Sequence, residues 1–184
     1  MMEGTKELTK EANKKLYHET NLRIIFSITL MAVLGVSSIT PAFPKIAQVM
    51  NISQETVGLL ITVFTLPGVI LTPVFGILAD RFGRKRILVP SLILFGIAGG
   101  AGAFTSDFNT LLNLRFIQGI GAAALGSLNS TLIGDIYSGK ERIEAMGYNA
   151  SVLSVGTATY PALGGALAMF GWNFPFILPV LAIP

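Results

Sequence analysis

The sequence contains no cysteine and a single histidine, His18. Without cysteine there is no disulfide framework, no thiol nucleophile and no thiolate metal site. One histidine in a polar stretch cannot build a metal cluster by itself. We therefore expect neither a metal nor a cofactor, and the function has to be sought in the hydrophobic and charged residues.

Charge is also scarce, because Asp, Glu, Lys and Arg make up only 12% of the 184 residues while hydrophobic residues make up 52%. The mean hydropathy of +0.66 is too high for an ordinary soluble domain, which presents a polar surface. The apolar residues form blocks close to the ~20 residues that cross a bilayer. The net charge of +3 is small and its basic residues lie between apolar blocks, so no nucleic-acid partner is expected.

Residues 1–21 form a polar segment of mixed charge ahead of the first apolar block. Leu8, Ala12 and Leu16 recur at helical spacing, so the segment is either a short helix on the membrane surface or a disordered tail. It is not a signal peptide, because its charged region is too long and no small-residue cleavage site follows a short apolar core. The remainder, residues 22–184, is predicted to form a transmembrane bundle.

Five apolar spans and the start of a sixth make up this bundle. They must be helices, because lipid offers no hydrogen-bond partner to open backbone. An even-stranded barrel is excluded because the apolar runs are continuous rather than alternating. The fold class is therefore an all-α membrane protein. We place the spans at 22–44, 55–78, 87–105, 110–136 and 144–170, with the last beginning near residue 174.

The sixth span is short, since only eleven residues run from Phe174 to Pro184. That is roughly half of what a crossing needs. The sequence is therefore expected to be the front part of a longer protein.

Basic residues gather in every second connection, while the other connections contribute only Lys45. By the positive-inside rule, this alternation places the N-terminus and the 79–86 loop in the cytoplasm of a multi-pass protein, and we expect the cell membrane as its location. The basic residues concerned are Lys6, Lys10, Lys14, Lys15 and Arg23 before the first span, Arg81, Arg84, Lys85 and Arg86 after the second, and Lys140 and Arg142 after the fourth.

The segment GILADRFGRKR, residues 76–86, has five charged residues among eleven. A simple topology signal is one interpretation, but orientation alone needs neither an acid nor glycines at these spacings. Glycine permits a tight turn and close helix approach, and an aspartate at a helix end can pair with an arginine. The segment resembles the signature loop between the second and third helices of the major facilitator superfamily. The matching residues are Gly76, Asp80, Arg81, Gly83, Arg84, Lys85 and Arg86.

The fourth span begins with LNLRFIQGIGAAA, which is similar to the fourth-helix motif of the same superfamily. A buried membrane arginine is costly and usually faces a cavity or a partner. The alternative is that Arg115 snorkels outward, because it lies near the outer end of the span. The resemblance implies a place in or beside the transport path for Arg115, Gln118, Gly119 and Gly121.

The fifth span contains GYNASVLSVGTATYPALGG, which resembles the motif that marks exporters within the superfamily. Tyr160 stands where that motif has a glycine, which weakens the match. Small residues allow close helix packing and proline bends a helix, and ordinary membrane packing is the alternative interpretation. The residues that match, and that would shape the interface between two bundles, are Gly147, Gly156, Pro161, Gly164 and Gly165.

Asp135 ends the fourth span on the side of the 79–86 loop. The resemblance implies that it pairs with Arg84 or Arg81 and that these groups form a cytoplasmic charge lock with Asp80. A solvated helix-end carboxylate is the alternative. The first span carries no acid, so a proton relay there would lack a titratable group.

The resemblance implies the N-terminal bundle of a secondary transporter, similar to the drug:proton antiporters of multidrug efflux. The predicted function is proton-coupled export of drugs or small metabolites by alternating access. The expected partners are the lipid bilayer, a small-molecule substrate, a proton and a second bundle that residues 1–184 lack. An importer or facilitator of a sugar or nutrient is the alternative, as is a truncated, non-transporting membrane module. No nucleophile–base pair or phosphate-cradling loop indicates an enzyme.

Overall fold

A computed structural model describes residues 20–183. The predicted polar segment 1–21 therefore lies almost entirely outside the described residues. The described residues form helices joined by short connections, with no strand among them, which confirms the all-α prediction. Its elements are α2 (Thr20–Ser37), η1 (Thr40–Ala42), α3 (Phe43–Met50), α4 (Gln54–Phe82), α5 (Arg84–Ala101), η2 (Gly102–Phe104), α6 (Phe108–Ile136), α7 (Gly139–Phe170) and η3 (Phe174–Ala182).

Within residues 20–183, five stretches are long and apolar enough to cross a membrane, as predicted. The first extends from Thr20 to Met50 and breaks at η1, where Pro41 and Pro44 interrupt the regular helix. The fifth helix begins at Gly139 instead of residue 144, because its charged first turns continue the helix beyond the apolar stretch. Hydropathy marks the part of a helix that lipid covers, so it misses such polar extensions.

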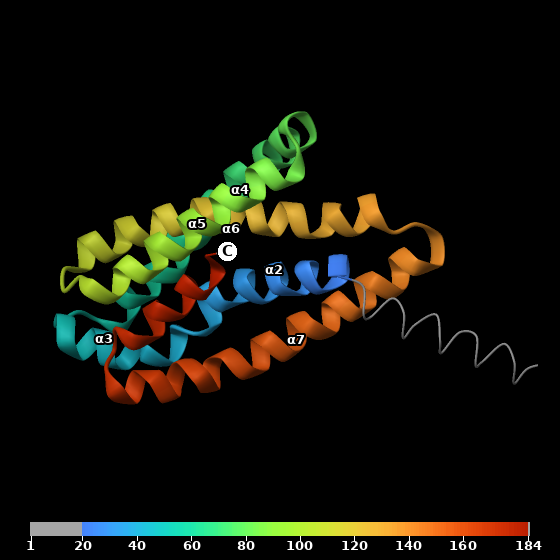
Figure 1. The fold of residues 1–184 in the computed structure, drawn as a ribbon. Coiled ribbons are helices and arrows are strands. Elements are labelled where there is room, and N and C mark those ends of the chain that lie inside the picture. The colour runs from blue at the N-terminus through green and yellow to red at the C-terminus, as the bar shows by residue number, and fades with distance from the viewer. Residues whose placement is uncertain (1–19, 184) are drawn as a thin grey trace, which may run out of the picture.

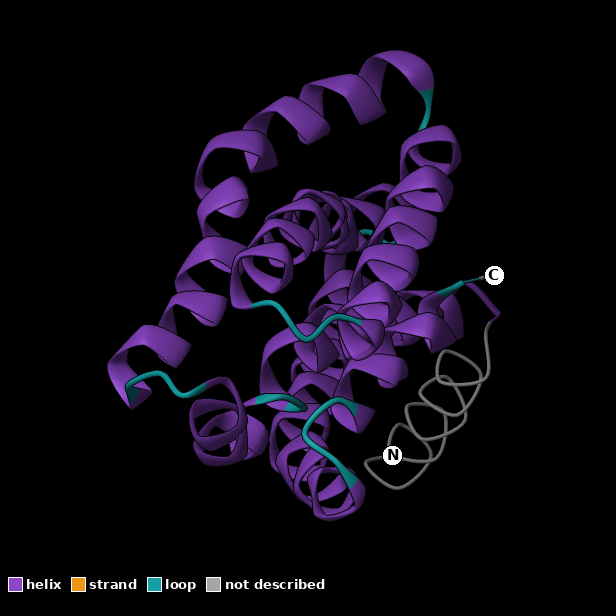
Figure 2. Cartoon of the chain, turned by 90° about the vertical axis from the view of Figure 1, so that its left-hand side faces the viewer, coloured by secondary structure: helices purple, strands orange, loops and turns teal. Residues whose placement is uncertain are grey.

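The helices run back and forth between two ends of the bundle (Figure 1). We call the end that holds the α4–α5 and α6–α7 turns and the start of α2 the basic end. The other end, which holds α3, η2 and the start of η3, is the opposite end. Figure 2 gives the second view of the same packing. Helix α6 packs closely against α4 and α5, and α2 lies between α6 and α7.

Close packing of α6 depends on two glycines. A Cβ at Gly119 would lie 2.1 Å from the carbonyl oxygen of Phe64 in α4, and one at Gly121 would lie 2.7 Å from that of Ser91 in α5. Any side chain at either position would push a neighbouring helix away. The two glycines therefore hold α6 as the centre of the bundle.

The apolar core continues from one end of the bundle to the other. At the opposite end, Ile46, Leu60, Leu111 and Phe176 are almost fully buried in one cluster. A middle cluster forms around Phe95, and a small cluster at the basic end contains Leu22, Ile25, Ile133, Tyr137 and Ala145.

Candidate functional site

The charged segment 76–86 is a one-residue turn rather than a loop. Asp80 and Arg81 belong to the last turn of α4, and Arg84 begins α5. Only Gly83 separates the helices, and its φ of 96° is a conformation that other residues rarely adopt. The expected 79–86 loop is therefore wrong in extent, because both helices continue to within one residue of the turn.

This turn brings Arg84 between two carboxylates. Its Nη2 lies 2.6 Å from Oδ1 of Asp80, and its Nε donates to Oδ2 of Asp135 at 2.9 Å. The Arg84 side chain is 21% exposed, whereas those of Asp80 and Asp135 are 66% and 48% exposed. We call this arrangement the Arg84 bridge. It joins α4, α5 and α6, so Asp135 is paired rather than simply solvated.

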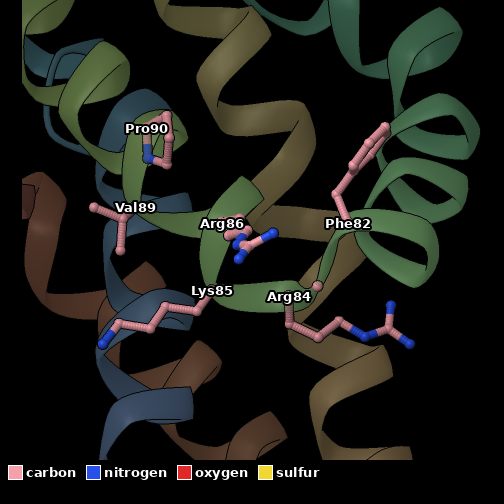
Figure 3. Close-up of a pocket in the computed structure, with 7 residues that line it drawn as sticks. Phe82, Arg84, Lys85, Arg86, Val89 and Pro90 are labelled. Atoms are coloured by element: carbon pink, nitrogen blue, oxygen red, sulfur yellow. The ribbon is translucent and has the colours of Figure 1, made fainter.

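The other residues of the motif lie around the bridge. The guanidinium of Arg81 lies over the Phe82 ring at 5.6 Å. Lys85 and Arg84 extend to opposite sides of the turn (Figure 3). Gly76 has open space where a Cβ would stand, so it makes no close helix contact in this structure. A surface cavity of about 640 Å³ is lined by Phe82, Gly83, Arg84, Lys85, Arg86, Val89 and Pro90.

Arg115 is buried, with only 1% of its surface exposed. Its Nη1 donates to the Gly35 carbonyl at 2.9 Å and to Oε1 of Gln118 at 2.8 Å. The ring of Phe176 lies 4.6 Å from the guanidinium, and that of Phe64 lies 5.8 Å away. Outward snorkelling is therefore wrong, because two rings and a carbonyl from other elements surround the side chain.

Several polar atoms in this region have no protein partner within the described residues. They are Nε and Nη2 of Arg115 and Nε2 of Gln118, and all three are buried. Nε2 lies next to Gly99 of α5, where a Cβ would be 2.5 Å away. A cation held this way keeps unused donors in the interior, which is unusual for a group with a purely structural role.

The glycines of the fifth-helix motif differ in what surrounds them, because some pack against the first span and one faces open space. Gly164 lies against the Ser38 backbone, where a Cβ would be 1.7 Å from the carbonyl oxygen. Gly156 and Gly165 face Leu30 and Pro41 of the first span, whereas Gly147 has open space. Pro161 lies within α7. Three of these glycines therefore pack against the first span inside this bundle. That they also shape an interface between two bundles stays a prediction.

Two features escaped the sequence analysis. Thr29, Asn129 and Asn149 form a buried polar cluster between α2, α6 and α7. Isolated asparagines inside apolar spans were the available signal, because an amide in lipid needs a partner. Lys45 donates to the carbonyls of Ala168 and Met169 at the end of α7. The basic residue that lies outside the basic connections therefore caps a helix.

Comparison with known proteins explains these motifs together. A family model described as the Major Facilitator Superfamily matches residues 25–183. The chain belongs to this superfamily. The match confirms the resemblance that the motifs indicated, and it identifies a multi-pass membrane protein of a transporter family.

Relatives of this superfamily chain include three bacterial proteins. The bacillibactin exporter of Bacillus subtilis strain 168 is 34% identical over 85% of this chain and 40% of the relative. Multidrug resistance protein 2 of the same organism is 33% identical over 83% of the chain and 38% of the relative. Quinolone resistance protein NorA of Staphylococcus aureus strain N315 is 29% identical over 83% of the chain and 39% of the relative. The chain thus spans about two-fifths of the length of these relatives.

Proposed function

We propose that this chain forms the first helical bundle of a proton-coupled exporter of drugs or small metabolites that works by alternating access. The names of the relatives support export, since one is an exporter and two confer drug resistance. The fifth-helix motif supports the same direction of transport, although Tyr160 departs from it.

The observation that carries this proposal is the Arg84 bridge. It holds three helices together at one end through a cation that is 21% exposed and two carboxylates that are 66% and 48% exposed. Ion pairs with exposed partners are weak, because water replaces them at little cost. Such a contact suits a charge lock that stabilises one state of the transporter and opens in the other.

Arg115 and Gln118 form the part of the proposed transport path that this bundle supplies. Their unused donors point to a polar group that reaches them during the cycle. Gly119 and Gly121 fix the place of α6 and hence of both side chains. A proton relay needs a titratable group, and the middles of the described spans contain no acidic side chain and no histidine. We therefore assign proton binding to a group outside these spans, or to one of a different kind from the usual carboxylate.

Efflux of a fluorescent cationic dye from cells that make the full-length transporter tests this proposal. Asp80→Asn should lower the initial efflux rate about two- to fivefold at equal membrane abundance, the range of an exposed ion pair. Lys140→Gln removes a cation from the same end and serves as the control. Uptake driven by the same gradient would contradict export, and wild-type efflux by Asp80→Asn would reduce the motif to a topology signal.

The cytoplasmic location of the basic end is part of the proposal and has its own test. The chain has no native cysteine, so single cysteines label cleanly. Gln54 begins α4 at the opposite end of the bundle, and Lys85 lies in the first turn of α5 at the basic end. Both positions are exposed, so Gln54→Cys and Lys85→Cys are the two variants to label. An impermeant maleimide should label the first and not the second in intact cells. Labelling of both from one face would refute the topology.

A further inference from the structure

Three uncharged side chains from three helices meet in the half of the bundle nearer the basic end. Thr29 and Asn129 are 4% and 7% exposed, and Asn149 is half-buried. The Thr29 hydroxyl donates to Oδ1 of Asn149 at 2.5 Å, and Nδ2 of Asn149 donates to Oδ1 of Asn129 at 3.0 Å. Nδ2 of Asn129 in turn donates to the hydroxyl oxygen of Thr29. We call this closed cycle the polar ring.

The ring satisfies its members almost completely. Asn129 uses its second N–H on the carbonyl of Ile25, at 3.3 Å, so both of its donors and its acceptor are engaged. Thr29 both donates and accepts. A satisfied ring of this kind fixes one geometry, because a shift of any helix breaks bonds that lipid cannot replace.

The three residues also lie at one depth. At a rise of 1.5 Å per residue, each stands roughly 10–15 Å from the end of its helix at the basic end. These ends are Thr20 for α2, Ile136 for α6 and Gly139 for α7. The ring therefore forms one layer across the three helices, in the half of the bundle nearer the basic end.

Helix α7 is the one that this layer holds. It is the least buried of the five spans, and few of its residues reach α6. At the opposite end, Gly164 of α7 packs against Ser38, and the side chain of Lys45 caps the last turn of α7. In the half near the basic end, Ala145 is the one fully buried residue of its first turns. The polar ring therefore ties this half of α7 to α2 and α6.

We propose that Thr29, Asn129 and Asn149 are positioning residues for transport, which set α7 against α2 and α6. This inference rests on the proposed transport function. The ring contains no titratable group, so it holds α7 equally at every pH and salt concentration. It thereby keeps this bundle in one piece while the Arg84 bridge opens and closes.

The decisive variant is Asn129→Asp in the full-length transporter. A protonated aspartic acid accepts from Asn149 and donates to Thr29, so it preserves the ring. An ionised one donates nothing and sets a charge beside the Ile25 carbonyl. Efflux relative to wild type should therefore fall as pH rises, by about 3- to 20-fold, the range of single hydrogen bonds between membrane helices. Asn113→Asp, at an exposed position on the same helix, is the matched control. Its efflux relative to wild type should not change with pH.

A second measurement follows the helices without transport. Spin labels at Arg23 and Met146, both exposed, report the α2–α7 distance at the basic end, and labels at Gln48 and Met169 report the opposite end. The double variant Thr29→Val with Asn149→Leu should broaden the distance distribution at the basic end and leave that at the opposite end unchanged. The single variant Thr29→Ser keeps the hydroxyl and should keep the narrow distribution at the basic end. If the distance distribution at the basic end is unchanged, the polar ring does not hold α7 against α2.

The two arms separate the possible failures. A broadened distribution with wild-type efflux overturns the positioning role. A pH-independent ratio for Asn129→Asp overturns it as well. Absence of efflux from the unmodified transporter refutes the proposed function, while the label distances still decide whether the ring holds α7.

Discussion

The two ends of the bundle are held by different kinds of contact. At the opposite end, apolar side chains such as Leu60 and Phe176 are fully buried, and three helix ends are capped by Ser53, Asp107 and Lys45. At the basic end, a smaller apolar cluster joins α2, α6 and α7, while α4, α5 and α6 are joined by the Arg84 bridge, whose carboxylates are 66% and 48% exposed. Burial is lost only by unpacking, whereas exposed ion pairs exchange with water at little cost. The opposite end is therefore the fixed part of this bundle, and the basic end is the part that can change.

The largest effect is expected where the opposite end is most tightly packed. Gly164→Ala puts a methyl group 1.7 Å from a backbone oxygen, so the helices must separate. Overpacking of this kind costs about 1–3 kcal/mol. Thermal unfolding in detergent should show the loss, while Gly147→Ala on the same helix, which faces open space, should be neutral. Equal stability of both variants would contradict the fixed-end interpretation.

Arg115 tests whether the fixed end also takes part in transport. Arg115→Lys and Arg115→Met both remove the fork of donors that only a guanidinium supplies. Efflux should fall roughly 10- to 100-fold, as expected for hydrogen bonds to a charged group. Melting temperature and membrane abundance are measured in parallel. If stability falls as steeply as efflux, the role of Arg115 is structural.

The basic end predicts a smaller and non-additive effect. Arg84→Ala and Asp135→Asn both remove the Arg84–Asp135 contact, and Arg84→Ala also removes the contact with Asp80, so each should reduce efflux about two- to fivefold. The double variant should lose less than the product of the single losses, because coupled groups are not additive. Initial efflux rates at matched abundance provide the measurement. Fully multiplicative losses would show that the two residues act separately.

The smallest expected effect concerns pH at the opposite end. Hydrogen bonds from the hydroxyl and the amide of Thr110 hold the pKa of Asp107 below its usual value. A lowered folded-state pKa stabilises the fold above the unfolded value of about 3.9, and this contribution is lost as pH falls through the folded value. Wild type should therefore lose stability relative to Asp107→Asn in this acidic window. If the melting temperatures of wild type and Asp107→Asn change in parallel from pH 6 to pH 3, the Asp107 cap does not contribute to stability.

Much of the fold could be predicted because the bilayer constrains it. Apolar blocks of the right length, separated by turns, gave five spans that the structure contains. The alternation of basic residues also gathers Arg81, Lys85 and Lys140 at one end, as the pattern indicated. Both results depend on properties that are local in sequence, namely hydropathy and charge.

Partners that are distant in sequence could not be chosen in the same way. Either Arg81 or Arg84 could have met Asp135, and the structure pairs it with Arg84, which begins α5 directly after the turn at Gly83. The position of Arg115 near a helix end was compatible with snorkelling until Gly35 and Phe176 were placed around it.

The sequence alone determined that the chain crosses the membrane as helices, which end carries the positive charge, and which superfamily its motifs resemble. Only the tertiary structure decided that Gly156 and Gly164 face the first span and that Thr29, Asn129 and Asn149 close a ring. The reason is physical. Hydropathy depends on each residue and its neighbours along the chain, whereas close approach and hydrogen bonding depend on how each helix is rotated and shifted against the others.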